Sequence, residues 1–179
     1  MTVTYITGGI RSGKSEFAER LAAASVGSVL YVAFGVETDE EMKKRIKMHQ
    51  ERRPNDWAVL EKPMELSGYL DVYQQYDCIL VDCLSTWVAN KCISIPEEEI
   101  KNEKHKEWII KEVEEWLETV QKLKKPVIVV SNEVGLGGVA LSPLGRLFQD
   151  VIGKVNQLIA HESDEAYAIL SGLPVRLKS

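Results

Sequence analysis

Several features are missing from this sequence, and each absence excludes a class of protein. No apolar run in the 179 residues approaches the roughly 18 residues that a membrane span needs, so we expect no transmembrane segment. The first residues predict a strand that leads into a glycine-rich loop, and not a signal peptide. Repeats and low-complexity tracts are absent as well. The sequence therefore predicts a cytoplasmic protein with one domain over residues 1–179.

Positive charge is not in excess. The chain has 22 Lys and Arg against 27 Asp and Glu, for a formal net charge of -5. A sequence-independent nucleic-acid binder needs a basic field, so we expect no nucleic-acid partner. The acidic balance does not exclude nucleotides, because local groups hold them.

Cysteine is scarce, with only Cys78, Cys83 and Cys92. Their number is odd, and the spacing of Cys83 and Cys92 fits no zinc-binding pattern. Buried thiols of a reducing compartment are therefore the prediction.

Apolar patterns predict strands that alternate with helices. The predicted strands are Val3 to Thr7, Ser28 to Ala33, Cys78 to Asp82, Val127 to Ser131, Ala166 to Leu170 and Val175 to Leu177. The predicted helices are Ser15 to about Ser25, Asp39 to Arg53, Pro96 to Leu123 with a Ser94/Glu97 capping box, and a helix opened by Pro143. This order indicates an α/β fold with a mostly parallel central sheet flanked by helices and a closing C-terminal β-hairpin.

A phosphate-binding loop follows the first strand. Its sequence, Gly8-Gly9-Ile10-Arg11-Ser12-Gly13-Lys14-Ser15, fits the G-x-x-x-x-G-K-[ST] pattern between a strand and a helix. Glycines let backbone N–H groups turn toward phosphate oxygens, and the helix adds the positive end of its dipole. Lys14 is expected to contact the β and γ phosphates as a catalytic residue, and Ser15 to coordinate Mg²⁺. Arg11 has two open interpretations: it contacts a transferring phosphate, or it pairs with a carboxylate.

Two further strand ends carry polar groups. Asp82 ends an apolar strand, which is where the acidic partner of a P-loop holds Mg²⁺ directly or through water. The other interpretation is an aspartate that only caps the next helix. Asn132 and Glu133 begin a glycine-containing segment that suits a substrate loop, although a plain strand-to-helix connection has the same features.

A basic segment contains a histidine. Arg45 and His49 lie four residues apart and share a face of the predicted helix, with Arg52 and Arg53 at its end. A lone histidine is most often structural or merely exposed. The functional hypothesis is a nucleophile that attacks phosphorus, because neutral imidazole is a good nucleophile near pH 7. The helix C-terminus favours imidazolium, so Arg45 or Arg52 would have to offset that effect.

Further motifs accompany the P-loop along nearly the whole chain. They are Tyr31-Val32-Ala33, Asp39-Glu40-Glu41-Met42 with Arg45-Ile46 and His49, Arg53-Pro54 with Trp57, Val81-Asp82-Cys83-Leu84 with Trp87 and Asn90, Ser131 to Gly137, Arg146 to Asp150 with Asn156-Gln157, and Ser171 to Pro174. This ordered set resembles the bifunctional adenosylcobinamide kinase/adenosylcobinamide-phosphate guanylyltransferase family of cobalamin biosynthesis.

The resemblance implies a RecA-like P-loop fold, a homotrimer and two reactions that need Mg²⁺. ATP or GTP phosphorylates adenosylcobinamide. GTP then transfers GMP through an enzyme histidine to adenosylcobinamide phosphate, which gives adenosylcobinamide-GDP and pyrophosphate. The guanylylated histidine maps onto His49, and Glu61 and Arg53 join the P-loop and Asp82 in nucleotide binding.

The resemblance breaks in one place and leaves two other functions open. After Gly137 the family continues Ile-Val-Pro, whereas this chain has Gly138-Val139-Ala140, which leaves the contacts of that loop open. One other hypothesis is a kinase without guanylyl transfer. The second is a RecA-like regulatory module that hydrolyses ATP to switch a partner.

Overall fold

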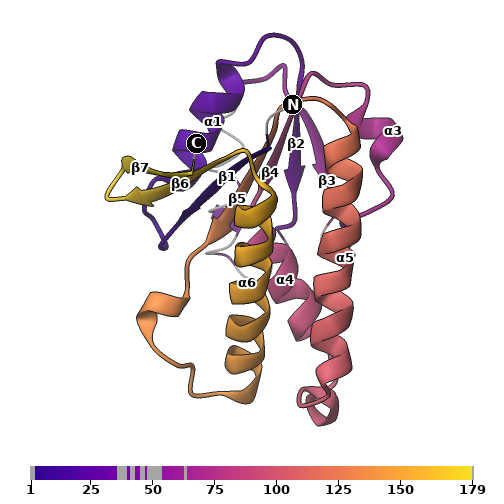
Figure 1. Ribbon diagram of the computed structural model, residues 1–179, viewed down its shortest axis with the longest axis vertical. Coiled ribbons are helices and arrows are strands. Elements are labelled where there is room, and N and C mark those ends of the chain that lie inside the picture. The colour runs from indigo at the N-terminus through magenta and orange to yellow at the C-terminus, as the bar shows by residue number, and fades with distance from the viewer. Residues whose placement is uncertain are drawn as a thin grey trace.

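A seven-stranded sheet with helices on both faces forms the framework of the molecule (Figure 1). The computed structural model describes residues 3–35, 40, 43–44, 47, 54–62 and 64–178. The sheet order is β3-β2-β4-β5-β1-β6-β7, and every neighbouring pair is parallel except the antiparallel β6–β7 hairpin. The strands are β1 (Val3–Gly8), β2 (Val29–Ala33), β3 (Ala58–Glu61), β4 (Cys78–Asp82), β5 (Val127–Asn132), β6 (Glu165–Leu170) and β7 (Leu173–Lys178).

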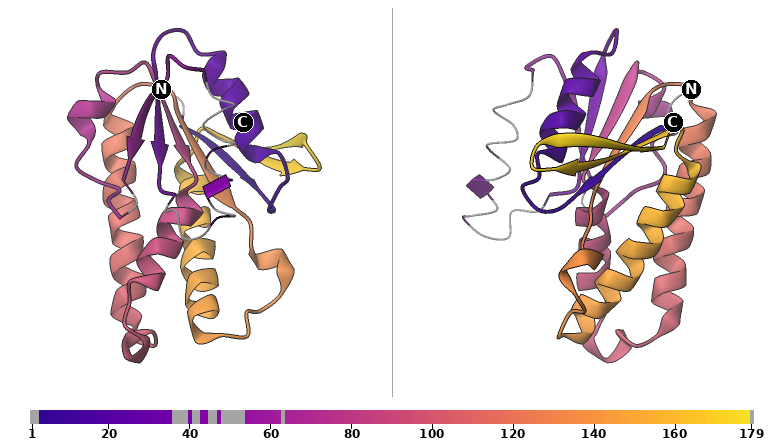
Figure 2. Two further views of the ribbon diagram at one scale, coloured as in Figure 1. Left: turned by 180° about the vertical axis from the view of Figure 1, so that it is seen from behind. Right: turned by 60° about the vertical axis from the view of Figure 1, so that its left-hand side comes forward.

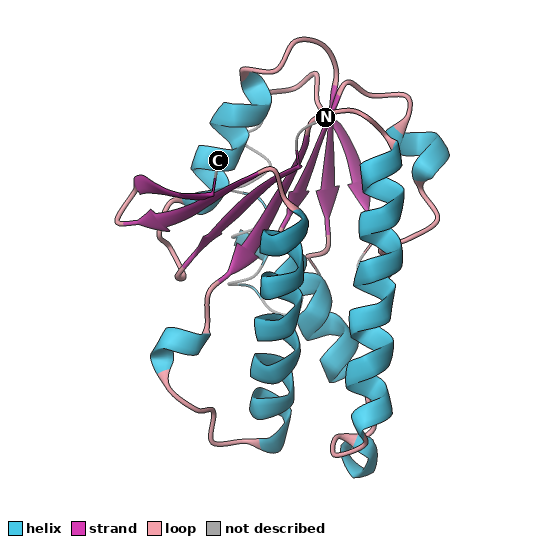
Figure 3. Ribbon diagram, in the orientation of Figure 1, coloured by secondary structure: helices cyan, strands magenta, loops and turns pink. Residues whose placement is uncertain are grey.

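The helices cover the sheet unequally. Helix α1 packs on one face, whereas α4, α5 and α6 pack on the other, as the turned view shows (Figure 2, right). Helices α5 and α6 contact each other and run past the end of the sheet (Figure 3). The helices are α1 (Lys14–Ala23), α3 (Leu70–Tyr73), α4 (Leu84–Ile93), α5 (Glu103–Lys122) and α6 (Pro143–Glu162), with 3₁₀ turns η1 (Glu97–Glu99) and η2 (Gly135–Gly137). None of the helices in the described part of the chain combines the length and the apolar composition that a membrane span requires.

Two layers of apolar side chains follow from the alternation along each strand. In β5, Val127 and Val129 pack toward α4, α5 and α6, whereas Ile128 and Val130 pack toward α1. Because both faces are covered, β4 and β5 begin as uninterrupted apolar runs, Cys78 to Val81 and Val127 to Val130, as buried parallel strands do. All three cysteines are free thiols; Cys78 and Cys92 are buried, as predicted, whereas Cys83 is only partly buried, and burial raises the pKa of Cys92 to about 11.

The sheet order confirms the RecA-like fold. Strand β5 lies between the P-loop strand β1 and the strand β4 that ends in Asp82. The predicted closing hairpin is also confirmed as β6–β7. At the start of α6, the Ser142 hydroxyl accepts a hydrogen bond from the backbone N–H of Gly145 at 3.0 Å, with Pro143 in the first turn.

The helix predicted over Pro96 to Leu123 begins later, and its predicted capping box is wrong. Helix α5 starts at Glu103, where the side chain of Asn102 accepts a hydrogen bond from the Lys104 N–H at 3.2 Å. Ser94 instead ends helix α4, which the sequence patterns did not predict. The predicted helix over Asp39 to Arg53 lies largely outside the described residues.

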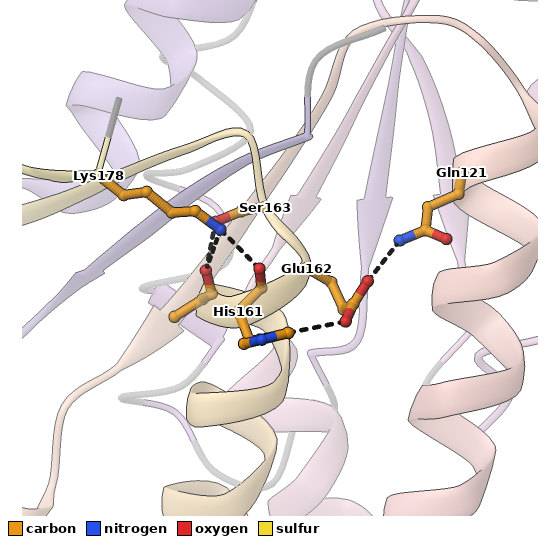
Figure 4. A network of polar contacts seen from close by, with 6 residues as sticks. Gln121, His161, Glu162, Ser163 and Lys178 are labelled. Atoms are coloured by element: carbon orange, nitrogen blue, oxygen red, sulfur yellow. Dashed lines mark hydrogen bonds and ion pairs between the residues drawn. The ribbon is translucent and has the colours of Figure 1, made fainter.

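The far end of the hairpin is fastened to the two long helices. The Lys178 ammonium donates to the carbonyl oxygens of Ala160 at 3.2 Å and His161 at 2.6 Å, and Gln121 donates to Glu162 at 2.9 Å (Figure 4). A cation at the carbonyl end of a helix is favourable, because those carbonyls lack helical partners. These bonds hold β7 to the end of α6 and α6 to α5.

Candidate nucleotide site

The carboxyl ends of the parallel strands gather the predicted site residues at one edge of the sheet. Gly8 of β1 lies opposite Asn132 of β5. Asp82 of β4 lies opposite Val130, two residues before Asn132. The glycine-rich loop therefore emerges beside Asn132 and near Asp82, the usual ligand-binding position of an open α/β sheet.

The P-loop is closely packed on both sides. Within the loop, the Ser12 N–H donates to the Gly9 carbonyl at 3.2 Å, and Gly13 takes a left-handed φ of 93° just before α1 begins. A Cβ on Gly8 would meet the Ser12 hydroxyl at 2.6 Å and a backbone oxygen of β6 at 2.7 Å. At the hairpin tip, the Gly172 N–H donates to the Ser12 carbonyl at 2.8 Å. Glycine at position 8 is therefore a steric requirement, and the C-terminal hairpin helps to hold the loop.

Lys14 lies over this loop. Its side chain is buried, and Nζ donates to the Gly9 carbonyl at 3.0 Å. Burial lowers the pKa of the ammonium, and nearby Cys83 and Asp82 oppose that shift. A buried ammonium at the start of α1, beside a glycine-rich loop, is suited to receive phosphate oxygens.

The carboxylate of Asp82 accepts two hydrogen bonds. The Ser15 hydroxyl donates to Oδ1 at 3.2 Å, and the Tyr31 hydroxyl donates to Oδ2 at 2.8 Å. The alternative role of Asp82 as a helix cap is not observed, since α4 has Cys83 at its N-cap and no side-chain capping bond. The Ser15 proton points toward Asp82, so the hydroxyl lone pairs remain available. A hydroxyl and a carboxylate are oxygen donors of the kind that Mg²⁺ prefers.

Asn132 is fixed by a buried polar network. Its Nδ2 donates to the Ser85 hydroxyl at 2.8 Å, and its backbone N–H reaches the same oxygen at 3.3 Å. Its carbonyl accepts from Asn156 at 3.0 Å, and Asn156 in turn accepts from Ser131 at 2.7 Å. Ser85, Ser131 and Asn156 are all buried, so these bonds are shielded from water and set the Asn132 side chain in one orientation.

The segment after Asn132 is bonded at both of its ends. The Glu133 N–H donates to the Gly8 carbonyl at 3.0 Å, which joins the segment to the P-loop strand. Farther along, Arg146 donates to the carbonyls of Ala140 at 3.1 Å and Leu141 at 2.7 Å. Gln149 also bonds the backbone of Gly138 and Ala140. In the segment after Gly137, where this chain departs from the family pattern, side chains of α6 therefore bond the backbone.

Comparison with known proteins decides the family. The model of the cobinamide kinase / cobinamide phosphate guanyltransferase family matches residues 4–177. The chain belongs to this family of enzymes. It is 39% identical to the bifunctional adenosylcobalamin biosynthesis protein CobP of Pseudomonas aeruginosa over 97% of this chain and 95% of that protein. It is 33% identical to CobU of Escherichia coli, over 97% and 98%, and 34% identical to CobU of Salmonella typhimurium, over the same shares.

A solved structure is also similar. It is a KaiC-like protein from Pyrococcus horikoshii, which covers 93% of this chain and 70% of that chain at 12% identity, with a TM-score of 0.49.

The predicted site of this cobinamide kinase / guanyltransferase family member is only partly described. The structure brings together Gly8 to Ser15, Asp82, Asn132 and Glu133, as the preceding contacts show. Glu61 ends β3 at the same edge, where it is exposed and lies opposite Ala33. His49 and Arg53 fall outside the described residues.

Arg11 keeps its two interpretations. It is exposed, with a left-handed φ of 58°, and no ion pair joins it to another described residue. Sequence reasoning missed the contacts of Tyr31 and Ser85 altogether. Tyr31 stands two residues before the end of β2, on the same face of the sheet as Asp82. This position in the strand was the signal from which the contact could have been predicted.

Proposed function

We propose that this chain phosphorylates adenosylcobinamide with ATP or GTP, and then transfers GMP from GTP to adenosylcobinamide phosphate through a guanylylated His49. The products of the second reaction are adenosylcobinamide-GDP and pyrophosphate. The observation that carries the proposal is the Ser15–Asp82 hydrogen bond of 3.2 Å beside the buried Lys14. The names of the relatives, bifunctional adenosylcobalamin biosynthesis proteins, support two activities in one chain.

In the kinase reaction the loop holds the triphosphate. Backbone N–H groups of Gly8 to Ser15 and the Lys14 ammonium, which lies over the loop, would stabilise the negative charge that develops on the transferring phosphoryl group. Ser15 and Asp82 would hold Mg²⁺, which neutralises phosphate charge when bound. Asn132 and Glu133, at the end of the neighbouring strand, would contact the hydroxyl that receives the phosphoryl group; the position of Asn132 opposite Gly8 supports this role.

In the guanylyl transfer His49 is the nucleophile. An imidazole nitrogen attacks the α-phosphorus of GTP, the bond from phosphorus to the bridging oxygen breaks, and pyrophosphate leaves. An oxygen of adenosylcobinamide phosphate then attacks the same phosphorus, and the imidazole is released unchanged. The family resemblance supports this step, together with nucleotide contacts from Arg53 and Glu61. The same resemblance supports a homotrimer, which sedimentation would measure.

Radiolabelled GTP tests the guanylyl half. GTP labelled at the α-phosphate should leave acid-labile label on the protein, GTP labelled at the γ-phosphate should not, and His49→Ala should abolish the α-label. His161→Ala is the matched control, because His161 is exposed and bonds Glu162 at the other edge of the sheet. A wild-type protein that takes up no label would reduce the proposal to a kinase.

Replacement of Lys14 tests the kinase half. Lys14→Ala should slow phosphorylation of adenosylcobinamide by a factor on the order of 10² or more, because a cation opposite the transferring group is lost. Activity within a few-fold of wild type would place the γ-phosphate elsewhere. Nucleotide turnover that ignores cobinamide and needs a macromolecular partner would instead favour a regulatory module.

A further inference from the structure

Tyr31 is a buried residue whose hydroxyl bonds the acidic group of the nucleotide site. It lies in the middle of β2 and is 2% exposed. Its hydroxyl donates to Asp82 Oδ2 at 2.8 Å, across from the Ser15 hydroxyl, which donates to Oδ1 at 3.2 Å. Each oxygen of the carboxylate thus accepts from a different element of the fold.

The register of the sheet explains this contact. Tyr31 lies opposite Leu80 of β4, and its side chain packs on the α1 face with Leu80. Asp82 is two residues beyond Leu80, so it points to the same face about 6.6 Å farther along the strand. Ser15 lies in the first turn of α1, which covers that face. A tyrosine side chain is long enough to reach forward to the carboxylate, whereas an aliphatic residue at position 31 would supply no donor.

We propose that Tyr31 is a positioning residue, which orients the Asp82 carboxylate and, through it, the Ser15 hydroxyl toward the Mg²⁺–nucleotide. This inference rests on the proposed function. A hydrogen bond to each oxygen fixes the rotation of the carboxylate plane. With Asp82 fixed, the Ser15 proton stays directed toward Oδ1 and the lone pairs of that hydroxyl stay directed away from it.

A role of Tyr31 through Asp82 separates the binding of Mg²⁺–nucleotide from the binding of nucleotide alone. Replacement of a residue that acts through Asp82 should reduce the additional affinity that the nucleotide gains from Mg²⁺. The affinity of the Mg²⁺-free nucleotide should not change, because P-loop N–H groups and Lys14 provide it. Tyr31→Phe removes the hydroxyl and keeps the buried ring. A hydrogen bond to a charged group is worth enough to shift an equilibrium by at least about tenfold, and only part of that effect reaches the Mg²⁺ through Asp82.

Binding of a fluorescent GTP analogue, with and without Mg²⁺, is the test. Tyr31→Phe should weaken binding in Mg²⁺ about 5- to 20-fold and raise the half-saturating Mg²⁺ concentration of the kinase reaction similarly. Binding without Mg²⁺ should stay within about twofold of wild type. Tyr73→Phe is the matched control, since Tyr73 is also a buried tyrosine but lies in α3, in the apolar cluster on the opposite face of the sheet. Tyr31→Leu gives a second measurement if the Phe variant is poorly folded.

A double-mutant cycle completes the test. In the Asp82→Asn background, Tyr31→Phe should cost less than about twofold, because its effect passes through the carboxylate. The inference is overturned if Tyr31→Phe behaves as Tyr73→Phe does, if it weakens binding equally without Mg²⁺, or if its cost is unchanged in the Asp82→Asn background. Failure of the proposed function would look different: the Lys14→Ala variant would then bind Mg²⁺–GTP as tightly as the wild-type protein does.

Discussion

The side chain of Lys14 folds back over its own loop, and its Nζ lies 3.0 Å from the carbonyl oxygen of Gly9. This ammonium is buried, and burial lowers its pKa. Without a phosphate, the charge is therefore held in a site that disfavours it. Residues selected for binding often reduce the stability of the empty protein in this way.

We therefore expect Lys14→Met to stabilise the nucleotide-free protein while it abolishes nucleotide binding. The gain should be about 1 kcal/mol, or roughly 2–4 °C in melting temperature. The pH dependence has a definite sign. Because the folded-state pKa lies below the usual 10.5, the unfolded chain binds more protons between these two pKa values. The wild-type free energy of unfolding should thus rise relative to that of Lys14→Met as pH increases through this window. A less stable variant at neutral pH would contradict this account.

Ser85 should support the position of Asn132. Ser85→Ala removes the acceptor of the Asn132 Nδ2 and backbone N–H, and a buried unsatisfied donor costs about 1–3 kcal/mol. Kinase kcat should fall roughly tenfold, with a smaller change in KM for the nucleotide. Ser94→Ala is a control at the end of the same helix, since the Ser94 hydroxyl donates to the Lys91 carbonyl at 2.7 Å. Equal kinetics for the two variants would show that Asn132 needs no support.

Arg146 should restrain the loop that precedes α6. Arg146→Ala removes the donors to Ala140 and Leu141. Opening of the loop should then become easier by about 1–2 kcal/mol, so cleavage by thermolysin within residues 134–142 should accelerate about 5- to 30-fold. Global melting should change little. Arg176→Ala, which removes an exposed ion pair with Glu165, should leave that cleavage rate unchanged. Cleavage at the wild-type rate in Arg146→Ala would mean that other contacts hold the loop.

Asp77 should contribute a pH-dependent part of the stability. Its carboxylate accepts from the Ser28 N–H at 2.8 Å and the Ser28 hydroxyl at 2.9 Å, and these bonds lower its pKa below the usual 3.8. The stabilisation is complete above the unfolded pKa and is lost as pH falls through the folded one. Urea unfolding should show that Asp77→Asn is less stable than wild type at neutral pH, with a difference that shrinks under acid conditions. A constant difference across this range would exclude the carboxylate charge as the cause.

Local patterns made part of this site predictable. The P-loop and the strand ending in Asp82 are continuous stretches of sequence, so the glycines, Lys14 and the carboxylate could be identified from their order and spacing. The four-residue strand Ala58–Glu61 and helix Leu84–Ile93 were missed. The strand is too short for a periodic signal, and the helix follows Asp82 directly, with no side-chain cap to mark its start.

The contacts that orient the site residues could not be predicted in the same way. Tyr31 contacts Asp82 because β2 pairs with β4 in the sheet. Ser85 contacts Asn132 because β4, which leads into the helix of Ser85, pairs with β5. A single sequence reveals which residues share a face of one strand. It does not reveal which strand lies next to it, because pairing depends on how the whole sheet is assembled.

The hairpin that touches the P-loop has a consequence for how the enzyme is made. Strand β1, which precedes the other strands of the sheet in the sequence, pairs with β5 and β6, and Gly172 at the hairpin tip bonds Ser12. A growing chain on the ribosome therefore carries an unfinished phosphate loop until residues from 165 onward have emerged. During translation, the ability to bind nucleotide should arrive late and abruptly, so that a polypeptide cut short before the hairpin would not sequester GTP.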